Sequence, residues 1–265
     1  MKFLFLLCSA AVLFVSCSPA KMALDTPGWQ NREILAVNGK RGLFTKENMH
    51  FGEYHTTSVK RSWIKGSSGR FGLGTETGNG YDYTNIISLD YIKKKQTIRF
   101  SMTDGNNNLS EVYCVSRFNT KDLTIGNRPN SIGNIGLDIA GFAAGYTNSM
   151  YYVQLYTKEQ ERPWEMLIDN IQSQSRPRSY TGYLSFSREE YYSIHPVYKM
   201  EGKDGKASNI LMGMVGFEFR DKAGHPVAAV SLLNKGTVYL QPLPAERKFL
   251  LANACAALLM QEQLG

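Results

Sequence analysis

The pattern of hydrophobic and polar positions is most pronounced near the C-terminus. Eleven of the twelve residues in 249–260 are apolar, and only Asn253 is polar. A helix that is apolar on all sides is typically buried. Twelve residues form a rod of about 18 Å, which is too short to cross a hydrocarbon core of about 30 Å. We therefore predict a core helix over residues 244–264, in which Asn253 makes a structural hydrogen bond to a strand.

Much of the remaining chain alternates apolar and polar residues, as half-buried strands do. Residues 211–220, for example, place Val215, Phe217 and Phe219 on the inner face, and Gly216, Glu218 and Arg220 on the outer face. Turn-forming residues separate the segments with this pattern. Further segments predicted to be strands include 34–37, 58–64, 96–103, 109–116, 150–157, 164–169, 183–187, 191–195, 227–233 and 237–241.

A single β-rich domain over residues 29–265 is the organisation that these elements predict. The chain has no fixed-period repeat and no shift in composition that would divide it. About a dozen strands and one buried helix predict a mainly β fold. Its form would be a closed or nearly closed antiparallel barrel around the hydrophobic C-terminal helix. An Asn-Gly pair at residues 38–39 predicts a hairpin turn, the glycine-rich residues 66–80 predict a surface loop, and the polar residues 172–178 predict a break.

The first residues of the chain have the layout of a secretory signal that ends at a cysteine. Lys2 precedes a mostly apolar run of 13 residues, and the small residue Ser16 stands directly before Cys17. This stretch resembles the lipobox of bacterial lipoproteins, with Phe14 at the position where leucine is usual. The resemblance implies that residues 1–16 are removed and that Cys17 is acylated, which would anchor the protein in a bilayer. The alternative is a secreted protein with Cys17 in a tether.

The residues that follow the cysteine indicate where in the cell the protein would be located. Residues 17–28 contain two prolines and have mixed polarity, so we predict a lipidated tether. In the lipoprotein family, an aspartate after the cysteine is linked to inner-membrane retention in some bacteria. Ser18 stands there in this chain, so the resemblance implies the outer membrane of the bacterial cell envelope. The net charge of +7 suits anionic lipid or polysaccharide, and nucleic acid is not expected as a partner there.

Two cysteines lie in the predicted domain. Cys114 belongs to a strand pattern, and Cys255 lies in the middle of the apolar helix. Both positions favour buried thiols that act as small hydrophobic side chains. A disulfide is the alternative, because the compartment permits one, and it would require Cα atoms within about 7 Å.

Metal-binding patterns in the sequence are incomplete. His50 and His55 are five residues apart, so on one continuous strand they would point to opposite faces, and a third ligand is lacking. Asp104, Asn106 and Asn108 are spaced like the first half of a calcium loop. The glycine and glutamate that such a loop requires are missing, so we predict a hairpin turn. We predict no metal site.

Catalytic motifs are also lacking. The sequence contains no G-x-S-x-G, H-E-x-x-H or P-loop pattern. His195 and His225 each precede a proline and are predicted to lie in turns, which leaves little for general acid–base chemistry. Glu189 and Glu190 are predicted at a hairpin tip. No catalytic residue and no cofactor site is therefore predicted.

A meander of about a dozen strands that ends in a buried C-terminal helix resembles the tubby-like barrel. This barrel is shared by tubby proteins, plant LURP-one-related proteins and phospholipid scramblases. The stretch GFEFRDKAGHPVAAV, residues 216–230, is similar to the strand–turn–strand unit of that family. The resemblance implies a closed barrel of twelve strands that encloses the helix. It implies membrane or phosphoinositide association by analogy only, and it assigns no binding residue to this chain.

Together these patterns favour a membrane-anchored envelope lipoprotein with a non-enzymatic binding or structural role. Its expected partners are the bilayer, through acylated Cys17, and an envelope protein, lipid or glycan. A barrel that binds a lipid or small ligand is an alternative, motivated by the apolar strand faces and 15 tyrosines. A carbohydrate-active hydrolase is a further alternative, since its two carboxylates need no local motif. They would lie about 5–9 Å apart in an aromatic cleft.

Overall fold

The structure is a computed structural model that describes part of the chain between residues 20 and 261. The predicted signal peptide and Cys17 lie outside the described residues, and so do most of the glycine-rich residues 66–80. The described ranges are 20–40, 48–64, 71–72, 87–89, 95–106, 108–118, 124–125, 150–157, 162–202, 204–211 and 213–261.

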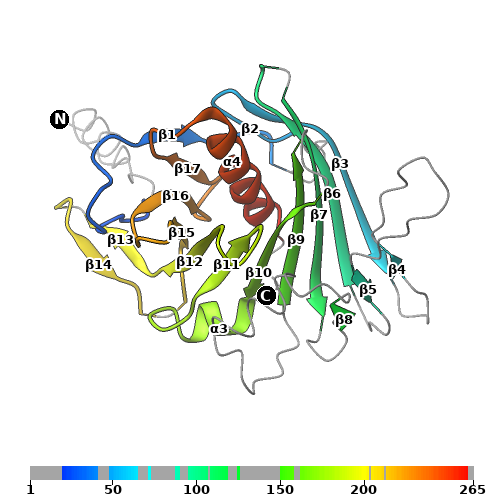
Figure 1. The fold of residues 1–265 in the computed structure, drawn as a ribbon. Coiled ribbons are helices and arrows are strands. Elements are labelled where there is room, and N and C mark those ends of the chain that lie inside the picture. Colours follow the sequence, from blue (N-terminus) through cyan, green and yellow to red (C-terminus); the bar gives the residue numbers. More distant parts are fainter. Residues whose placement is uncertain are drawn as a thin grey trace, which may run out of the picture.

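Twelve strands form one antiparallel sheet that is nearly closed into a barrel (Figure 1). Its strand order is β1-β17-β16-β15-β12-β11-β10-β9-β7-β6-β3-β2. The mainly β barrel predicted from the alternating pattern is therefore confirmed. The strands are β1 (Glu33–Ala36), β2 (His50–Phe51), β3 (Tyr54–Ile64), β6 (Lys95–Thr103), β7 (Leu109–Phe118), β9 (Met150–Thr157), β10 (Trp164–Asp169), β11 (Gly182–Ser185), β12 (Tyr191–Val197), β15 (Gly216–Arg220), β16 (Pro226–Ser231) and β17 (Thr237–Leu240).

Smaller elements lie beside the barrel. A short helix, α3 (Asn170–Ser175), follows β10, where the sequence predicted only a polar break. Its first turn is capped by Asp169, whose carboxylate accepts a hydrogen bond from the backbone N–H of Gln172 at 2.9 Å. Two small sheets complete the described elements. They consist of β13 (Lys199–Glu201) with β14 (Ala207–Asn209), and of β4 (Phe71–Gly72), β5 (Ile87–Leu89) and β8 (Thr124–Ile125).

The two ends of the twelve-stranded sheet meet where β1 approaches β2. The backbone N–H of Asn38 donates to His50 O at 2.9 Å, and the N–H of His50 donates to Asn38 O at 3.0 Å. The predicted hairpin turn at residues 38–39 is wrong, because β1 pairs with β17 and Asn38 instead closes the barrel against β2. The Asn-Gly signal is local, whereas this pairing joins distant residues such as Ala36 and Thr237, which are 201 positions apart.

Helix α4 (Ala245–Met260) occupies the barrel interior (Figure 1). Every residue in 249–260 is buried, which confirms the core helix predicted from its all-round apolar pattern. The helix ends at Met260 and not at residue 264, since Gln261 has an extended backbone. Arg61 Nη2 donates to Met260 O at 3.0 Å, which places a cation at the negative end of the helix dipole. None of the helices in the described ranges has the length and apolar character to cross a membrane.

Two polar contacts fix the rotation of α4 in the barrel. Asn253 Oδ1 accepts from Ser110 Oγ of β7 at 2.6 Å, which is the structural hydrogen bond predicted for Asn253. Tyr151 of β9 donates its hydroxyl proton to Ala257 O at 2.7 Å. Because both contacts are buried, breaking either one would leave a polar group without a partner and lower the stability of the fold. Together they specify one orientation of the helix.

The two cysteines of the domain are free and buried, as their positions favoured. Burial raises the pKa of Cys114 to about 12 and also raises the pKa of Cys255. Both thiols therefore stay protonated near neutral pH and pack as small apolar groups.

Residues 20–32, which we call the strap, run over the outside of the barrel before β1 begins. Met22 and Trp29 form a second apolar cluster with Val215, Ala229 and Tyr239. Gly216, the residue after Val215, is required for this contact. A Cβ there would lie 2.5 Å from Met22 Sδ and 2.1 Å from Val230 O.

Two findings about the strap differ from the sequence prediction. Val215 was expected to point inward, but it packs in this outer cluster. Residues 17–28 were expected to be a tether, yet their described part, residues 20–28, is held on the barrel. Asn234 Nδ2 donates to Ala20 O at 3.2 Å, and the N–H of Ala23 donates to Lys199 O at 3.0 Å.

Candidate functional site

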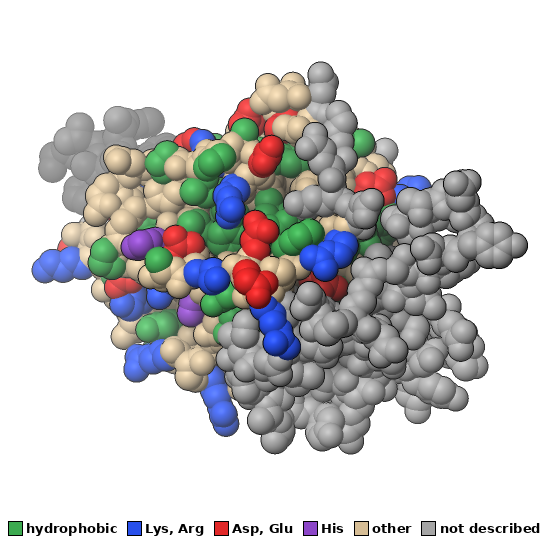
Figure 2. Space-filling model, viewed as in Figure 1, with side chains coloured by type: hydrophobic (Ala, Val, Ile, Leu, Met, Phe, Trp, Pro, Cys, Tyr) green, Lys and Arg blue, Asp and Glu red, His purple; other side chains and the backbone are tan. Residues whose placement is uncertain are grey.

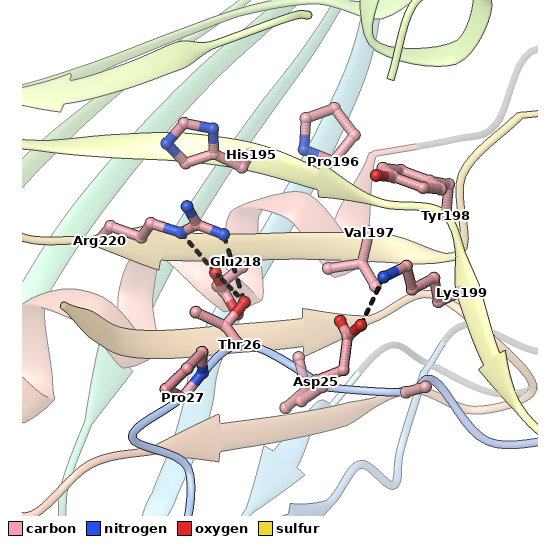
Figure 3. Close-up of a pocket in the computed structure, with 12 residues that line it drawn as sticks. Asp25, Thr26, Pro27, His195, Pro196, Val197, Tyr198, Lys199, Glu218 and Arg220 are labelled. Atoms are coloured by element: carbon pink, nitrogen blue, oxygen red, sulfur yellow. Dashed lines mark hydrogen bonds and ion pairs between the residues drawn. The ribbon is translucent and has the colours of Figure 1, made fainter. Parts of the chain in front are cut away.

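A depression on the outer surface lies between the strap and strands β12 and β15 (Figure 3). Its volume is about 310 Å³, and it is lined by residues 23–27 of the strap, residues 195–199, and two side chains of β15. It gathers charged and polar groups from three distant parts of the chain, namely Asp25, Thr26, His195, Lys199, Glu218 and Arg220.

The alternation and register of β12 and β15 place four side chains on the outer face of the barrel. Glu218 and Arg220 point outward, as the sequence predicted, while Phe217 belongs to the core around α4. The register sets His195 opposite Glu218 and Ser193 opposite Arg220. Directly opposed residues of neighbouring strands lie within contact distance on one face, so these four side chains form one cluster.

Glu218 is the centre of this cluster, and it is only 2% exposed. Trp29 Nε1 donates to Glu218 Oε2 at 2.8 Å, and Thr26 Oγ1 donates to Glu218 Oε1 at 3.2 Å. Arg220 Nε donates to Glu218 Oε1 at 2.5 Å. A buried carboxylate needs such donors to offset its lost hydration. Since the strap supplies two of the three, Glu218 fastens the strap to the barrel.

The side chains of His195 and Arg220, which lie beside Glu218, differ in charge (Figure 3). Arg220 is permanently charged, and its Nη2 donates to Thr26 Oγ1 at 3.3 Å. Burial, followed by the positive charge of Arg220, lowers the pKa of His195 to about 4. His195 is therefore a neutral imidazole near neutral pH, with Nε2 3.0 Å from Ser193 Oγ.

A surface ion pair between Lys199 and Asp25 lies at the rim of the depression (Figure 3). The hydrogen bond with Asp25 raises the pKa of Lys199, so the amine keeps its charge. The cationic groups of Arg178 and Lys199 lie 5.4 and 5.9 Å from the centre of the Tyr198 ring. Exposed ion pairs contribute little stability, so this rim can rearrange more easily than the buried Glu218 contacts.

These contacts make the depression better suited to binding than to acid–base catalysis. The carboxylate of Glu218 already accepts three hydrogen bonds, and Asp25 is paired with Lys199. A glycosidase needs one carboxyl group that donates a proton and another that acts as base or nucleophile. The two carboxylates at this depression are instead committed to structural partners.

The structure places other predicted residues away from this depression. Cys17 lies outside the described residues. Asp104 accepts hydrogen bonds from the backbone N–H groups of Asn106 and Asn108, at 2.9 and 3.3 Å, in the predicted hairpin turn between β6 and β7. Glu190 lies in the predicted turn before β12, 3.5 Å from Arg247 of α4.

The histidine predictions need correction. His195 lies within β12 and not in a turn, although His225 lies in the expected turn before Pro226. His50 and His55 were expected on opposite faces of one strand. They instead belong to two strands of a hairpin and are register partners. Within the ranges that the structure describes, no group of three or more His, Cys, Asp or Glu side chains is placed to hold a metal ion.

Sequence reasoning missed the Glu218 cluster because its partners are far apart in the chain. Thr26 and Glu218 are separated by 192 positions, and Trp29 and Glu218 by 189. No family model matches the chain, and neither does any curated protein or solved structure.

Proposed function

We propose that this protein is a lipoprotein of the bacterial cell envelope with a non-enzymatic binding or structural role. Acylated Cys17 would hold it in the bilayer, and Ser18 after the cysteine favours the outer membrane. The observation that carries the proposal is the position of the strap. Ala20, three residues after the cysteine, is bound to the outside of the barrel by Asn234.

The position of Ala20 would set the orientation of the barrel relative to the membrane. Three residues span at most about 10 Å, so an anchor at Cys17 would keep the barrel close to the lipid headgroups. The edge near Ala20 includes exposed Lys21, Lys206 and Lys235, but it also carries exposed Asp204. Acidic and basic side chains are likewise interspersed on the described part of the face in Figure 2. The short tether, more than the charge, would therefore determine the orientation.

The filled interior directs the proposed binding role to the outer surface. Because α4 occupies the barrel and residues 249–260 are buried, a lipid or small ligand would compete with the helix for space. The depression beside the strap is one outer site that the described residues offer to a ligand or an envelope partner. The paired carboxylates there weigh against the carbohydrate-active hydrolase.

The relation to tubby-like barrels is part of the proposal. It is motivated by the twelve strands in one antiparallel sheet and by the C-terminal helix inside it. A shared architecture does not establish a shared function. It supports a membrane-associated role by analogy, and it transfers no ligand to the depression.

Detergent partitioning of the full chain, produced in a Gram-negative bacterium, tests the proposal. We expect the wild-type protein in the detergent phase and the Cys17→Ser variant in the aqueous phase, because acyl chains on the cysteine carry the membrane affinity. Cys8→Ser is the matched control, since it removes a cysteine of the same segment and should leave partitioning unchanged. Equal partitioning of wild type and Cys17→Ser would overturn the proposed anchor.

A further inference from the structure

Two of the four histidines in the chain face each other across the β2–β3 hairpin. His50 and His55 are register partners, and both are exposed. The hairpin is closed by a two-residue turn, in which Gly52 has a φ of 58°. Glycine adopts this left-handed conformation without strain, which allows the tight reversal between the two histidines.

The backbone hydrogen bonds show which kind of cross-strand pair the histidines form. The N–H and C=O groups of His50 both bond to Asn38, on the side away from β3. On the other side, the N–H of Thr56 donates to Met49 O at 2.9 Å. His50 and His55 therefore form a non-hydrogen-bonded pair. In such pairs the Cα atoms are about 4.5 Å apart, and the side chains lie closest together.

This arrangement suits the joint binding of one metal ion. Two nitrogen ligands at about 2.0–2.1 Å from a tetrahedral ion lie about 3.3 Å apart, which two adjacent imidazoles can reach. Neutral imidazole is a preferred ligand of Zn²⁺, Cu²⁺ and Ni²⁺, and affinities generally peak at Cu²⁺. We propose that His50 and His55 together form a binding site for a divalent transition metal ion.

The surroundings of the pair indicate an open, exchangeable site. The residues next to it in the same row of the sheet are Asn38, opposite His50, and Thr103, opposite His55, and both are uncharged. Glu53 lies in the turn between the two histidines, and its exposed carboxylate accepts a hydrogen bond from Asn106 Nδ2 at 3.4 Å. Two protein ligands leave the remaining positions to solvent, in contrast to closed structural zinc sites with four.

Metal binding at this pair would be coupled to closure of the barrel. His50 also provides the two backbone hydrogen bonds that join β2 to Asn38. An ion held by both histidines would tie β2 to β3 in the folded state, and a ligand of the folded state raises its stability by mass action. This inference does not depend on the lipid anchor, so it can fail or succeed independently of the proposed function.

Titration of the full-length protein in detergent with Cu²⁺, followed by electron paramagnetic resonance, tests the site. We expect saturable binding of one ion, with hyperfine coupling to two imidazole nitrogens in its spectrum. His50→Gln and His55→Gln should each weaken binding at least tenfold and abolish the increase in Tm that Zn²⁺ produces. The His225→Gln variant is the control, because His225 is exposed in a different turn, and it should bind like wild type.

Two results would overturn the proposed metal site. Either the absence of saturable binding, or a two-nitrogen spectrum that persists in His55→Gln, would contradict it. The His55→Gln variant keeps the backbone contacts of His50 with Asn38, so loss of binding there cannot be attributed to an opened barrel. Circular dichroism identical to that of wild type would verify its fold.

Discussion

At the scale of single residues, Glu218 and its partners link the strap to the barrel. The sequence placed Glu218 and Arg220 correctly on the outer face of β15. It did not show that Glu218 is buried, because the groups that cover it, Trp29 and Thr26, come from a segment expected to be a tether. A strand pattern reports the face on which a side chain lies, but not what covers that face.

Replacing Glu218 with Gln tests this link. The change removes the charge that pairs with Arg220 and turns one acceptor into a donor that faces the Trp29 and Thr26 donors. We expect the free energy of unfolding to fall by about 2 kcal/mol. Urea denaturation followed by tryptophan fluorescence measures it. Exposed Glu201→Gln should change the value by less than about 0.5 kcal/mol, and a similarly small change for Glu218→Gln would contradict the link.

The lowered pKa of His195 predicts a specific loss of stability in acid. As the pH falls below the ordinary value of 6.5, the unfolded chain binds a proton that the folded chain does not bind until about pH 4. The stabilising contribution is therefore complete above pH 6.5 and is lost between these two values. Because the ring is partly exposed, we expect this loss to be about 2 kcal/mol.

Urea unfolding at pH 7 and pH 4.5 measures this contribution. The His195→Gln variant should lose less stability than wild type between the two pH values, whereas His225→Gln should follow the wild-type profile. Parallel profiles for wild type and His195→Gln would show that the neutral imidazole does not contribute to acid sensitivity.

At the scale of elements, the sequence correctly predicted those elements whose structure is determined by residues close together in the chain. Helix α4 could be predicted because its pattern is apolar on all sides over one continuous stretch. The Asn38-Gly39 pair gave a misleading hairpin signal, because β1 pairs with a strand near the other end of the chain. The β2–β3 hairpin was missed because the sequence segment around Glu53 has no Asn-Gly or Asp-Gly pair.

The contact between Asn253 and Ser110 tests how α4 is fixed in the barrel. We expect Asn253→Ala to lower the free energy of unfolding by about 2 kcal/mol, through the lost hydrogen bond and a small cavity. A double-mutant cycle with Ser110→Ala, measured by urea denaturation, should give a coupling energy of about 1 kcal/mol. Additive effects of the two substitutions would mean that the 2.6 Å contact does not orient the helix.

At the scale of the whole molecule, the barrel was predictable and the outer depression was not. Twelve strands and a filled interior follow from patterns that extend over most of the chain. The depression depends on where residues 20–32 dock, which is set by long-range contacts such as that of Met22 with Gly216. The same docking holds Ala20, three residues after Cys17 in the sequence, on the barrel surface, which connects the fold to the proposed anchor.

The intact mass of the full chain, extracted from the envelope of a Gram-negative bacterium, tests the central claim most directly. The account predicts a chain that begins at Cys17 and carries the added mass of acyl groups on that residue. It predicts an unacylated chain for Cys17→Ser. A wild-type chain without acyl mass, cleaved at another position or not cleaved, would contradict the anchor and the membrane orientation derived from it.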